Sequence, residues 1–309
     1  MNSKKLRNTF LLVLTAFIWG SAFVAQSTGG DAVGPYTFNA VRSIIGGFIL
    51  IPVTIFLDKK GLSSKKPVTP ADRKKLLLGG VLCGVILCIS SNLQQMGLFL
   101  GATPGKAGFL TACYILIVPI LGIFIKRKCG WNVWLGVVTT LVGLYLLCCT
   151  DNSLTMNFAD VLLLLCAFGF SIHILVIDRF TPFVDGVRMS MIQFLVCGIL
   201  SGVPAVFVDI PRMSLPVWLS TFQTADAWIP ILYAGLLSCG VGYTLQIVAQ
   251  NGINPTIASL IMSLESVFAV LAGWVILGDT LSFRETIGCI LMFGAIILAQ
   301  LPVGKKIDC

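Results

Sequence analysis

Long apolar stretches alternate along this sequence with short polar connections. The hydrocarbon core of a bilayer is about 30 Å thick, and about 20 apolar residues in an α-helix cross it. Breakers such as Gly34-Pro35 and Gly278-Asp279 separate neighbouring stretches and predict turns. The pattern therefore predicts an all-α integral membrane protein with ten transmembrane helices. They run from Thr9 to Gln26, Tyr36 to Leu57, Leu76 to Leu100, Pro104 to Ile125, Trp131 to Cys149, Phe158 to Ile177, Val187 to Val208, Trp228 to Gln250, Pro255 to Leu277 and Thr286 to Leu301.

Composition supports a membrane protein and excludes other classes. Of the 309 residues, 57% are hydrophobic and only 11% are charged, whereas soluble domains carry about 25% charged residues. The net charge of +8 could suggest a nucleic-acid partner. The basic residues lie between apolar runs, however, and do not line one polar face, so we expect no nucleic-acid partner.

The basic residues also predict the orientation of the chain. With the N-terminus placed in the cytoplasm, 17 of the 21 Lys and Arg residues fall in cytoplasmic segments. Cytoplasmic loops of membrane proteins carry such an excess. The pattern therefore predicts that both termini are cytoplasmic in a multi-pass protein of the plasma or inner membrane. The exceptions are Lys106, Arg212 and Arg284 outside, and Arg42 within a span.

Metal and cofactor sites are not expected. Most of the eleven cysteines lie inside apolar runs, no two have C-x-x-C spacing, and His173 is the sole histidine. A zinc site needs several nitrogen or sulfur ligands that converge. Buried cysteines acting as small apolar residues explain this pattern better.

The chain also resembles itself at an offset of 151 residues. Without a gap, this offset aligns the first five predicted helices with the second five, so we predict two repeats, at residues 9–149 and 158–301. Polar, Gly and Pro matches at one offset argue against chance. They include Gly47 with Gly198, Gly84 with Gly235, Cys88 with Cys239, Gln95 with Gln246, Gly101 with Gly252 and Pro104 with Pro255.

An odd number of helices per repeat means that the second repeat enters the membrane in the opposite sense. The charges agree, because the loop after the second predicted helix carries seven basic residues and its counterpart carries only Arg212. Inverted repeats are the architecture of secondary transporters, whose substrate site lies near the midplane between the repeats.

The segment from Ser263 to Trp274, SLESVFAVLAGW, and the acidic turn Gly278-Asp279 after it carry a resemblance to a known family. The chain resembles the EamA-type transporters of the drug/metabolite transporter superfamily. It departs from them at Ser266, where the family usually has Pro, and at Asp279, where Glu is common. Trp19-Gly20-Ser21 and Arg42 also fit. The resemblance implies ten spans, a central cavity open to one side at a time and, often, export of metabolites such as amino acids.

Ionisable groups inside membrane spans are costly and are candidates for function. Glu265 lies about ten residues from Pro255, which places it near the midplane. It could couple transport to protons or cations or hold a substrate amine, or it could bond a neighbouring helix. Arg42 could hold a substrate carboxylate, or it could extend toward the interface or pair within the bundle.

Other polar and aromatic side chains could line the cavity. Five polar residues lie close together between Ser90 and Gln95, and they cannot all face lipid. We predict that Asn92, Gln95 and Gln246 border one central cavity. His173 is a weaker candidate for proton transfer, and Gln193 is the repeat equivalent of Arg42. Trp19, Tyr114 and Trp274 could stack on the substrate or serve packing alone, and Tyr243 lies with Gln246 among the polar residues of the eighth predicted helix, which could also line the cavity.

The sequence therefore favours a secondary transporter, and specifically an exporter, of a small polar metabolite such as an amino acid. Its predicted partners are the substrate, the lipid bilayer and a proton as coupling ion, and a homodimer stays open. A membrane-embedded enzyme is an alternative, but one histidine and one deep acid leave little for a catalytic constellation. A scaffold or receptor without transport is the other alternative, and it would have no evident use for the repeat.

Overall fold

The computed structural model describes residues 3–63, 65–102, 104–125, 130–148, 156–272 and 282–300. Throughout these ranges all regular structure is helical, as predicted. Seven helical segments are long and apolar enough to cross a membrane, and two shorter apolar helices cover Trp131–Leu146 and Pro255–Leu271. The elements in chain order are α1 (Ser3–Val33), α2 (Pro35–Lys59), α3 (Pro70–Phe99), α4 (Pro104–Ala112), α5 (Tyr114–Phe124), α6 (Trp131–Cys148), α7 (Phe158–Phe180), α8 (Gly186–Pro204), the π-helix η1 (Ala205–Asp209), α9 (Ile210–Met213), α10 (Leu215–Thr221), α11 (Ala225–Leu232), the π-helix η2 (Tyr233–Gly242), α12 (Tyr243–Gln250), α13 (Pro255–Met262), α14 (Glu265–Ala272) and α15 (Phe283–Gln300).

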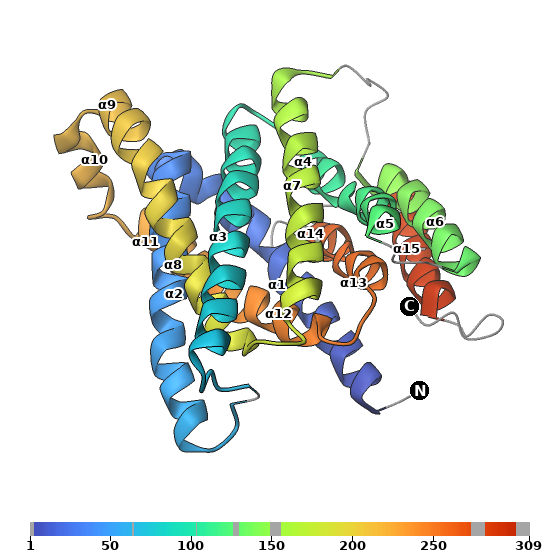
Figure 1. Cartoon of the computed structure of the whole chain (residues 1–309). Helices are drawn as coiled ribbons and strands as arrows, with labels where there is room; N and C mark the ends of the chain where they lie inside the picture. Colours follow the sequence, from blue (N-terminus) through green and yellow to red (C-terminus); the bar gives the residue numbers. More distant parts are fainter. Residues whose placement is uncertain are drawn as a thin grey trace.

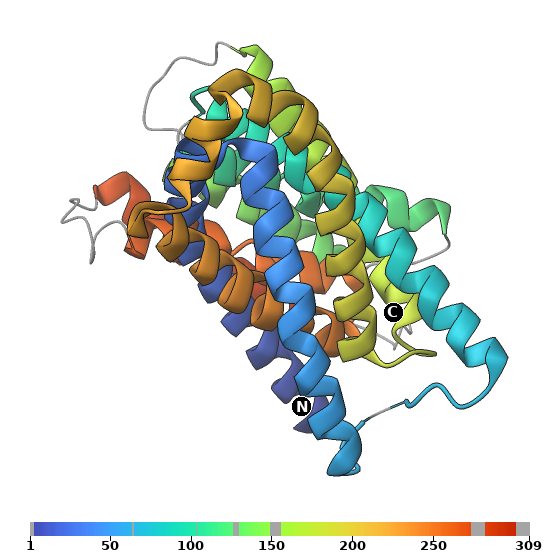
Figure 2. The same cartoon turned by 90° about the vertical axis from the view of Figure 1, so that its left-hand side faces the viewer.

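The helices form a bundle in which the first and second halves of the sequence interleave (Figure 1). Helix α2 packs along α8, and α3 packs between α7 and α8. Helix α1 runs through the bundle against η2, α12 and α14, whereas α6 and α15 pair with each other at one side (Figure 1). Figure 2 shows α8 in yellow beside α2 in blue. Neighbours in space therefore come mostly from opposite halves of the chain.

Two helices that the sequence predicts as continuous are each broken in the middle. The first breaks at Cys113 between α4 and α5, and the second breaks at Ser263 and Leu264 between α13 and α14. Tightened bonds mark both breaks: the N–H of Cys113 donates to a carbonyl three residues earlier, as does the N–H of Leu264. Neither break contains Gly or Pro. At the second break, the Ser263 hydroxyl bonds the Leu260 carbonyl, a local bond that bends helices.

Contacts between α2 and α8 depend on the absence of side chains at two glycines. A Cβ on Gly47 would lie 2.8 Å from Leu195 Cδ2 and 3.1 Å from the Leu195 backbone nitrogen. A Cβ on Gly198 would lie 2.6 Å from Ile44 Cγ1 and 3.0 Å from the Ile44 nitrogen. Each glycine thus lets the backbone of the other helix approach closely.

Outer surfaces of the bundle are apolar, as expected for helices that face lipid. Phe48, Ile55 and Phe56 of α2 are exposed. Ile199 of α8 and Phe207 of η1 are exposed as well. Several predicted features lie outside the described residues. They are Trp274, the turn at Gly278-Asp279, Asn152 in the connection between the repeats, and the basic residues Lys126, Arg127, Lys128, Lys305 and Lys306.

Candidate functional site

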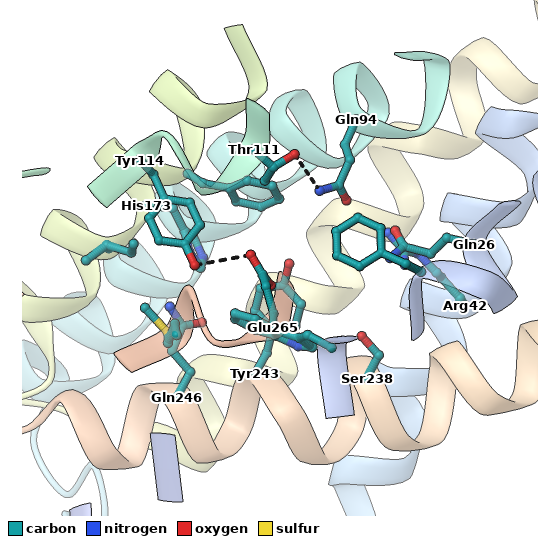
Figure 3. Close-up of a pocket in the computed structure, with 15 residues that line it drawn as sticks. Gln26, Arg42, Gln94, Thr111, Tyr114, His173, Ser238, Tyr243, Gln246 and Glu265 are labelled. Atoms are coloured by element: carbon teal, nitrogen blue, oxygen red, sulfur yellow. Dashed lines mark hydrogen bonds between the residues drawn. The ribbon is translucent and has the colours of Figure 1, made fainter. Parts of the chain in front are cut away.

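A cavity lies where the two halves of the chain meet (Figure 3). It is bordered by polar, charged and aromatic side chains from both halves. Seven of them are sequence candidates: Trp19, Arg42, Tyr114, His173, Tyr243, Gln246 and Glu265. The others are Phe23, Gln26, Gln94, Thr111, Phe170, Ile174, Ser238 and Met262.

Glu265 and Tyr114 both line the cavity, and their side chains point toward each other (Figure 3). Tyr114 is the first residue of α5 and Glu265 is the first residue of α14, so each begins the second half of a broken helix. The Tyr114 hydroxyl donates to Glu265 Oε1 at 3.2 Å. The Glu265 side chain is only 5% exposed, and it belongs to none of the ion pairs in the described ranges. A helix N-terminus favours a carboxylate at this position, because the free N–H groups there carry partial positive charge.

Arg42 brings a positive charge to the same cavity. The residue is 5% exposed, its Nε is buried without a hydrogen-bond partner, and it forms none of the ion pairs of the described ranges. Its guanidinium carbon lies 5.2 Å from the centre of the Phe38 ring, a cation–π contact. A buried guanidinium without an anion is costly, so the position suits a ligand that supplies one.

Aromatic rings form one wall of the cavity around Tyr243. The Trp19 and Tyr243 ring centres lie 4.5 Å apart, and Phe194 meets Tyr243 edge to face at 5.3 Å. The His173 ring meets Tyr243 in the same geometry at 6.1 Å. Behind it, Gln193 Oε1 lies 3.0 Å from His173 Nε2 and fixes the orientation of the imidazole. Gln193 therefore does not border the cavity itself, and it acts on the cavity through His173.

The polar residues of α3 between Ser90 and Gln95 do not all face the cavity. Gln246 borders the cavity, whereas Asn92 and Gln95 are not among the residues that line it. Asn92 bonds the Ser201 hydroxyl at 2.9 Å and accepts from Asn39 at 2.9 Å, and Gln95 bonds the Gln26 carbonyl at 2.6 Å. Consecutive residues of a helix point about 100° apart, so neighbouring polar residues of α3 face different sides. Asn92 and Gln95 face other helices and hold α3 to them through these hydrogen bonds.

The residue of α3 that does border the cavity is Gln94. Its amide donates to the Thr111 hydroxyl at 3.2 Å, and both side chains line the space (Figure 3). Thr111 lies three residues before Tyr114, on the other side of the break between α4 and α5. The break therefore directs polar groups from both half-helices toward the same cavity.

Comparison with known proteins identifies the family. The family model described as EamA-like transporter family matches residues 7–149 and again residues 157–301. The chain belongs to this family. The resemblance drawn from the SLESVFAVLAGW segment is thus confirmed, and this EamA-like protein is a multi-pass membrane transporter.

Relatives of this EamA-like transporter extend over most of its length. An uncharacterized transporter of Archaeoglobus fulgidus is 27% identical over 307 residues, which cover 97% of this chain and 88% of that protein. The S-adenosylmethionine/S-adenosylhomocysteine transporter of Chlamydia muridarum is 22% identical over 286 residues, which cover 88% of this chain and 84% of that protein. A solved crystal structure matches with a TM-score of 0.75 at 17% identity, covering 95% of this chain and 96% of its own, which shows a shared fold.

Several cavity residues of this EamA-like transporter are absent from the sequence-based candidates. Gln26 was placed at the end of the first span, but α1 continues to Val33, which puts Gln26 well inside the helix. Gln94 belongs to the group of five polar residues between Ser90 and Gln95, and Ser238 lies within an apolar stretch. The signal that could have found them is the same one that found Asn92, namely a polar side chain that cannot face lipid.

Proposed function

We propose that this transporter exports a small polar metabolite that carries both a carboxylate and an amine, such as an amino acid or a related compound. The observation that carries the proposal is the presence of Arg42 and Glu265, two buried side chains of opposite charge, on one cavity. A guanidinium matches a carboxylate in shape and in hydrogen-bond donors. A carboxylate in a buried site accepts from a substrate ammonium group.

A zwitterionic substrate would compensate both buried charges at once. An isolated charge in a site of low dielectric is unfavourable unless an opposite charge and hydrogen bonds accompany it. The rings of Trp19 and Tyr243 offer an apolar surface to the remainder of the substrate. The relative from Chlamydia muridarum is named for two compounds that contain an amino-acid head group, which agrees with this substrate class.

The architecture we propose for transport is a pair of inverted five-helix repeats, at residues 9–149 and 158–301, with both termini in the cytoplasm. Contacts that recur with partners exchanged support it. Gly47 packs against Leu195, and Gly198 packs against Ile44. Gly198 is the repeat equivalent of Gly47, and Leu195 is the repeat equivalent of Ile44, each at an offset of 151 residues. Such reciprocal contacts are what a two-fold relation produces. The two matches of the family model agree with the proposed boundaries.

Alternating access follows from this arrangement. In transporters with inverted repeats, one repeat rocks against the other around a fixed site near the midplane. Tyr114 and Glu265 are repeat equivalents that bond each other, and we propose that they lie at the centre of this motion. We propose further that Glu265 is protonated in at least one transport state and exchanges its proton as the cavity opens to either side.

Reconstitution tests the proposed substrate class. Purified protein in proteoliposomes should exchange radiolabelled neutral amino acids, and the analogous amines without a carboxylate and acids without an amine should compete poorly. Thermal shift should report the same ranking, because a ligand that binds the folded state stabilises it. Competition by either single-charge analogue as strong as that of the amino acid itself would reject the zwitterion proposal. A reporter at Lys65 and another at Asn152 should lie on opposite sides of the membrane.

A further inference from the structure

Two acidic residues that the transport proposal does not use occupy equivalent positions in the repeats. Asp58 lies near the end of α2, and Asp209 ends η1, which continues α8. Their positions differ by 151 residues. Asp58 Oδ1 accepts from Arg188 Nη2 at 2.6 Å, near the start of α8. Asp209 Oδ2 accepts from the Thr37 backbone N–H at 2.6 Å, near the start of α2.

The two contacts are reciprocal. Thr37 and Arg188 are also 151 residues apart, so each acid bonds the residue that is equivalent to the other acid's partner. Both contacts cross from one repeat to the other. They lie about 21 residues apart along α2, which corresponds to about 32 Å of helix. One contact therefore holds the α2–α8 pair together at each end, and we refer to the two contacts as the Asp58 clasp and the Asp209 clasp.

The Asp209 clasp is a helix cap supplied by the other repeat. Gly34 precedes α2 with φ +94°, and it has no side chain to cap the helix. A Cβ at this position would lie 2.5 Å from the Asp209 carboxyl carbon, so glycine is required for the acid to reach Thr37. Caps of this kind stabilise a helix N-terminus. Asp209 is 1% exposed, which protects the bond from water.

The Asp58 clasp differs because α8 caps itself. Asp185, the repeat equivalent of Gly34, accepts from the Arg188 backbone N–H at 2.9 Å. The Arg188 guanidinium reaches Asp58 across the repeat boundary, and it also lies 3.7 Å from Asp185 Oδ1. Ser63 also donates to Asp58 at 2.5 Å, and Lys66 lies 3.5 Å away, both from the connection that follows α2.

The segment after η1 covers the other clasp in a similar way. Trp218 of α10 donates from Nε1 to the Thr37 hydroxyl at 3.1 Å. Between the clasps, the backbones of α2 and α8 are in close contact at Gly47 and Gly198. The pair is thus in close backbone contact at its middle and held by polar contacts at its two ends, so a tilt about the middle would open one end and press the other together.

We propose that the Asp58 and Asp209 clasps are alternating latches of the α2–α8 pair, so that releasing one tightens the other. The proposal rests on the alternating access proposed above. Arg42 lies on α2 between the Asp209 clasp and Gly47, so a tilt of α2 would move the guanidinium relative to the cavity. Equivalent residues on an inverted pair make the two latches similar in kind, and the difference between a side-chain ion pair and a backbone cap sets which one releases first.

Hydrogen exchange of the full-length protein in lipid nanodiscs, without substrate, tests the coupling. Asp58→Asn and Arg188→Gln both break the same clasp. Each should speed amide exchange about two- to fivefold in residues 54–62 and 185–191, and should slow exchange in residues 34–40 and 205–211. Asp209→Asn should produce the opposite pattern. The matched control is Asp72→Asn, because Asp72 closes a capping box with Thr69 at the start of its own helix.

A change confined to the altered end, or no change at either end, would overturn the proposal. If Asp209→Asn fails to fold, Asp58→Asn and Arg188→Gln decide the outcome alone, since they alter a contact nearer to the surface. Because no substrate is present, a failed transport assay would leave this result intact. Absence of reciprocal exchange in a protein that does transport amino acids would remove the latches and keep the proposed function.

Discussion

Gly47 and Gly198 have the same packing role in the two halves of the chain, whereas Arg42 and Gln193 have different roles. Both pairs lie on α2 and α8 at an offset of 151 residues. The two glycines meet equivalent backbone atoms of the opposite helix. Arg42 borders the cavity with a charged side chain, but Gln193 is absent from the cavity lining and its Oε1 lies 3.0 Å from His173 Nε2.

Residues that pack the helices together are thus equivalent in the two halves, whereas residues at the cavity are not. Under the proposed alternating access, equivalent packing at equivalent positions would give two arrangements of similar energy. A substrate, in contrast, has no two-fold symmetry, so the side chains that bind it must differ between the halves. Tyr114 and Glu265 combine both properties, because equivalent positions carry different groups that bond each other.

The largest expected effect comes from making the cavity's acid neutral. Glu265→Gln keeps the size of the side chain and can still accept from Tyr114. If Glu265 exchanges the coupling proton, the variant should reach the membrane and lose accumulation driven by a pH gradient. Substrate exchange without a gradient should persist with a raised KM, because Gln keeps an oxygen that accepts from the substrate ammonium group but lacks the negative charge. Proteoliposome flux with and without an imposed gradient measures both. Gradient-driven flux with unchanged pH dependence would reject proton coupling through this residue, and loss of folded protein would instead indicate a packing role.

The next effect tests the asymmetry of Arg42 and Gln193 directly. Arg42→Gln gives α2 the residue that α8 carries at the equivalent position. Hydrogen bonds to charged groups contribute about 1.5–3 kcal/mol, so the KM for a substrate carboxylate should rise about 10- to 100-fold. Amines without a carboxylate should be affected little. Arg212→Gln is the control, because Arg212 contacts the Phe99 ring at 4.3 Å, away from the cavity.

How far the sequence predicts this molecule depends on the kind of feature. The all-helical membrane fold and the family are confirmed, because apolar length and the segment around Glu265 are local signals. Glu265, Arg42 and Tyr114 do border one cavity, and ionisable or aromatic groups within spans pointed to them.

The sequence does not predict which face of a helix meets the cavity. Gln94 and Gln95 are adjacent and chemically identical, yet only Gln94 lines the space, because the rotation of α3 is set by its packing against α7 and α8. The breaks before Tyr114 and Glu265 were missed for a similar reason. No Gly or Pro marks them, and the tightened bonds that form them depend on the surrounding helices.

A third prediction concerns the symmetric part of the comparison. Gly47→Ala and Gly198→Ala each place a Cβ under 3.0 Å from a side-chain atom of the facing helix. Overpacking of this kind costs about 1–3 kcal/mol, and the two losses of stability should be similar. Thermal unfolding in detergent measures them. Gly202→Ala is the control, because nothing lies within 4 Å of its added Cβ. Loss at only one of the two glycines would break the equivalence of the halves.

The smallest effect is expected at the bond that joins the two repeat equivalents. Tyr114→Phe removes the hydroxyl that donates to Glu265 and keeps the ring in place. A hydrogen bond of this kind contributes about 0.5–1.5 kcal/mol, or a factor of about 2–10, and we expect a change of that size in the rate of exchange. The control is Tyr243→Phe, which lines the same cavity and keeps its ring contact with Trp19. In the Glu265→Gln background the Tyr114→Phe change should have less effect, because the two residues act through one contact. Full additivity of the two changes would show that Tyr114 acts on the substrate independently of Glu265.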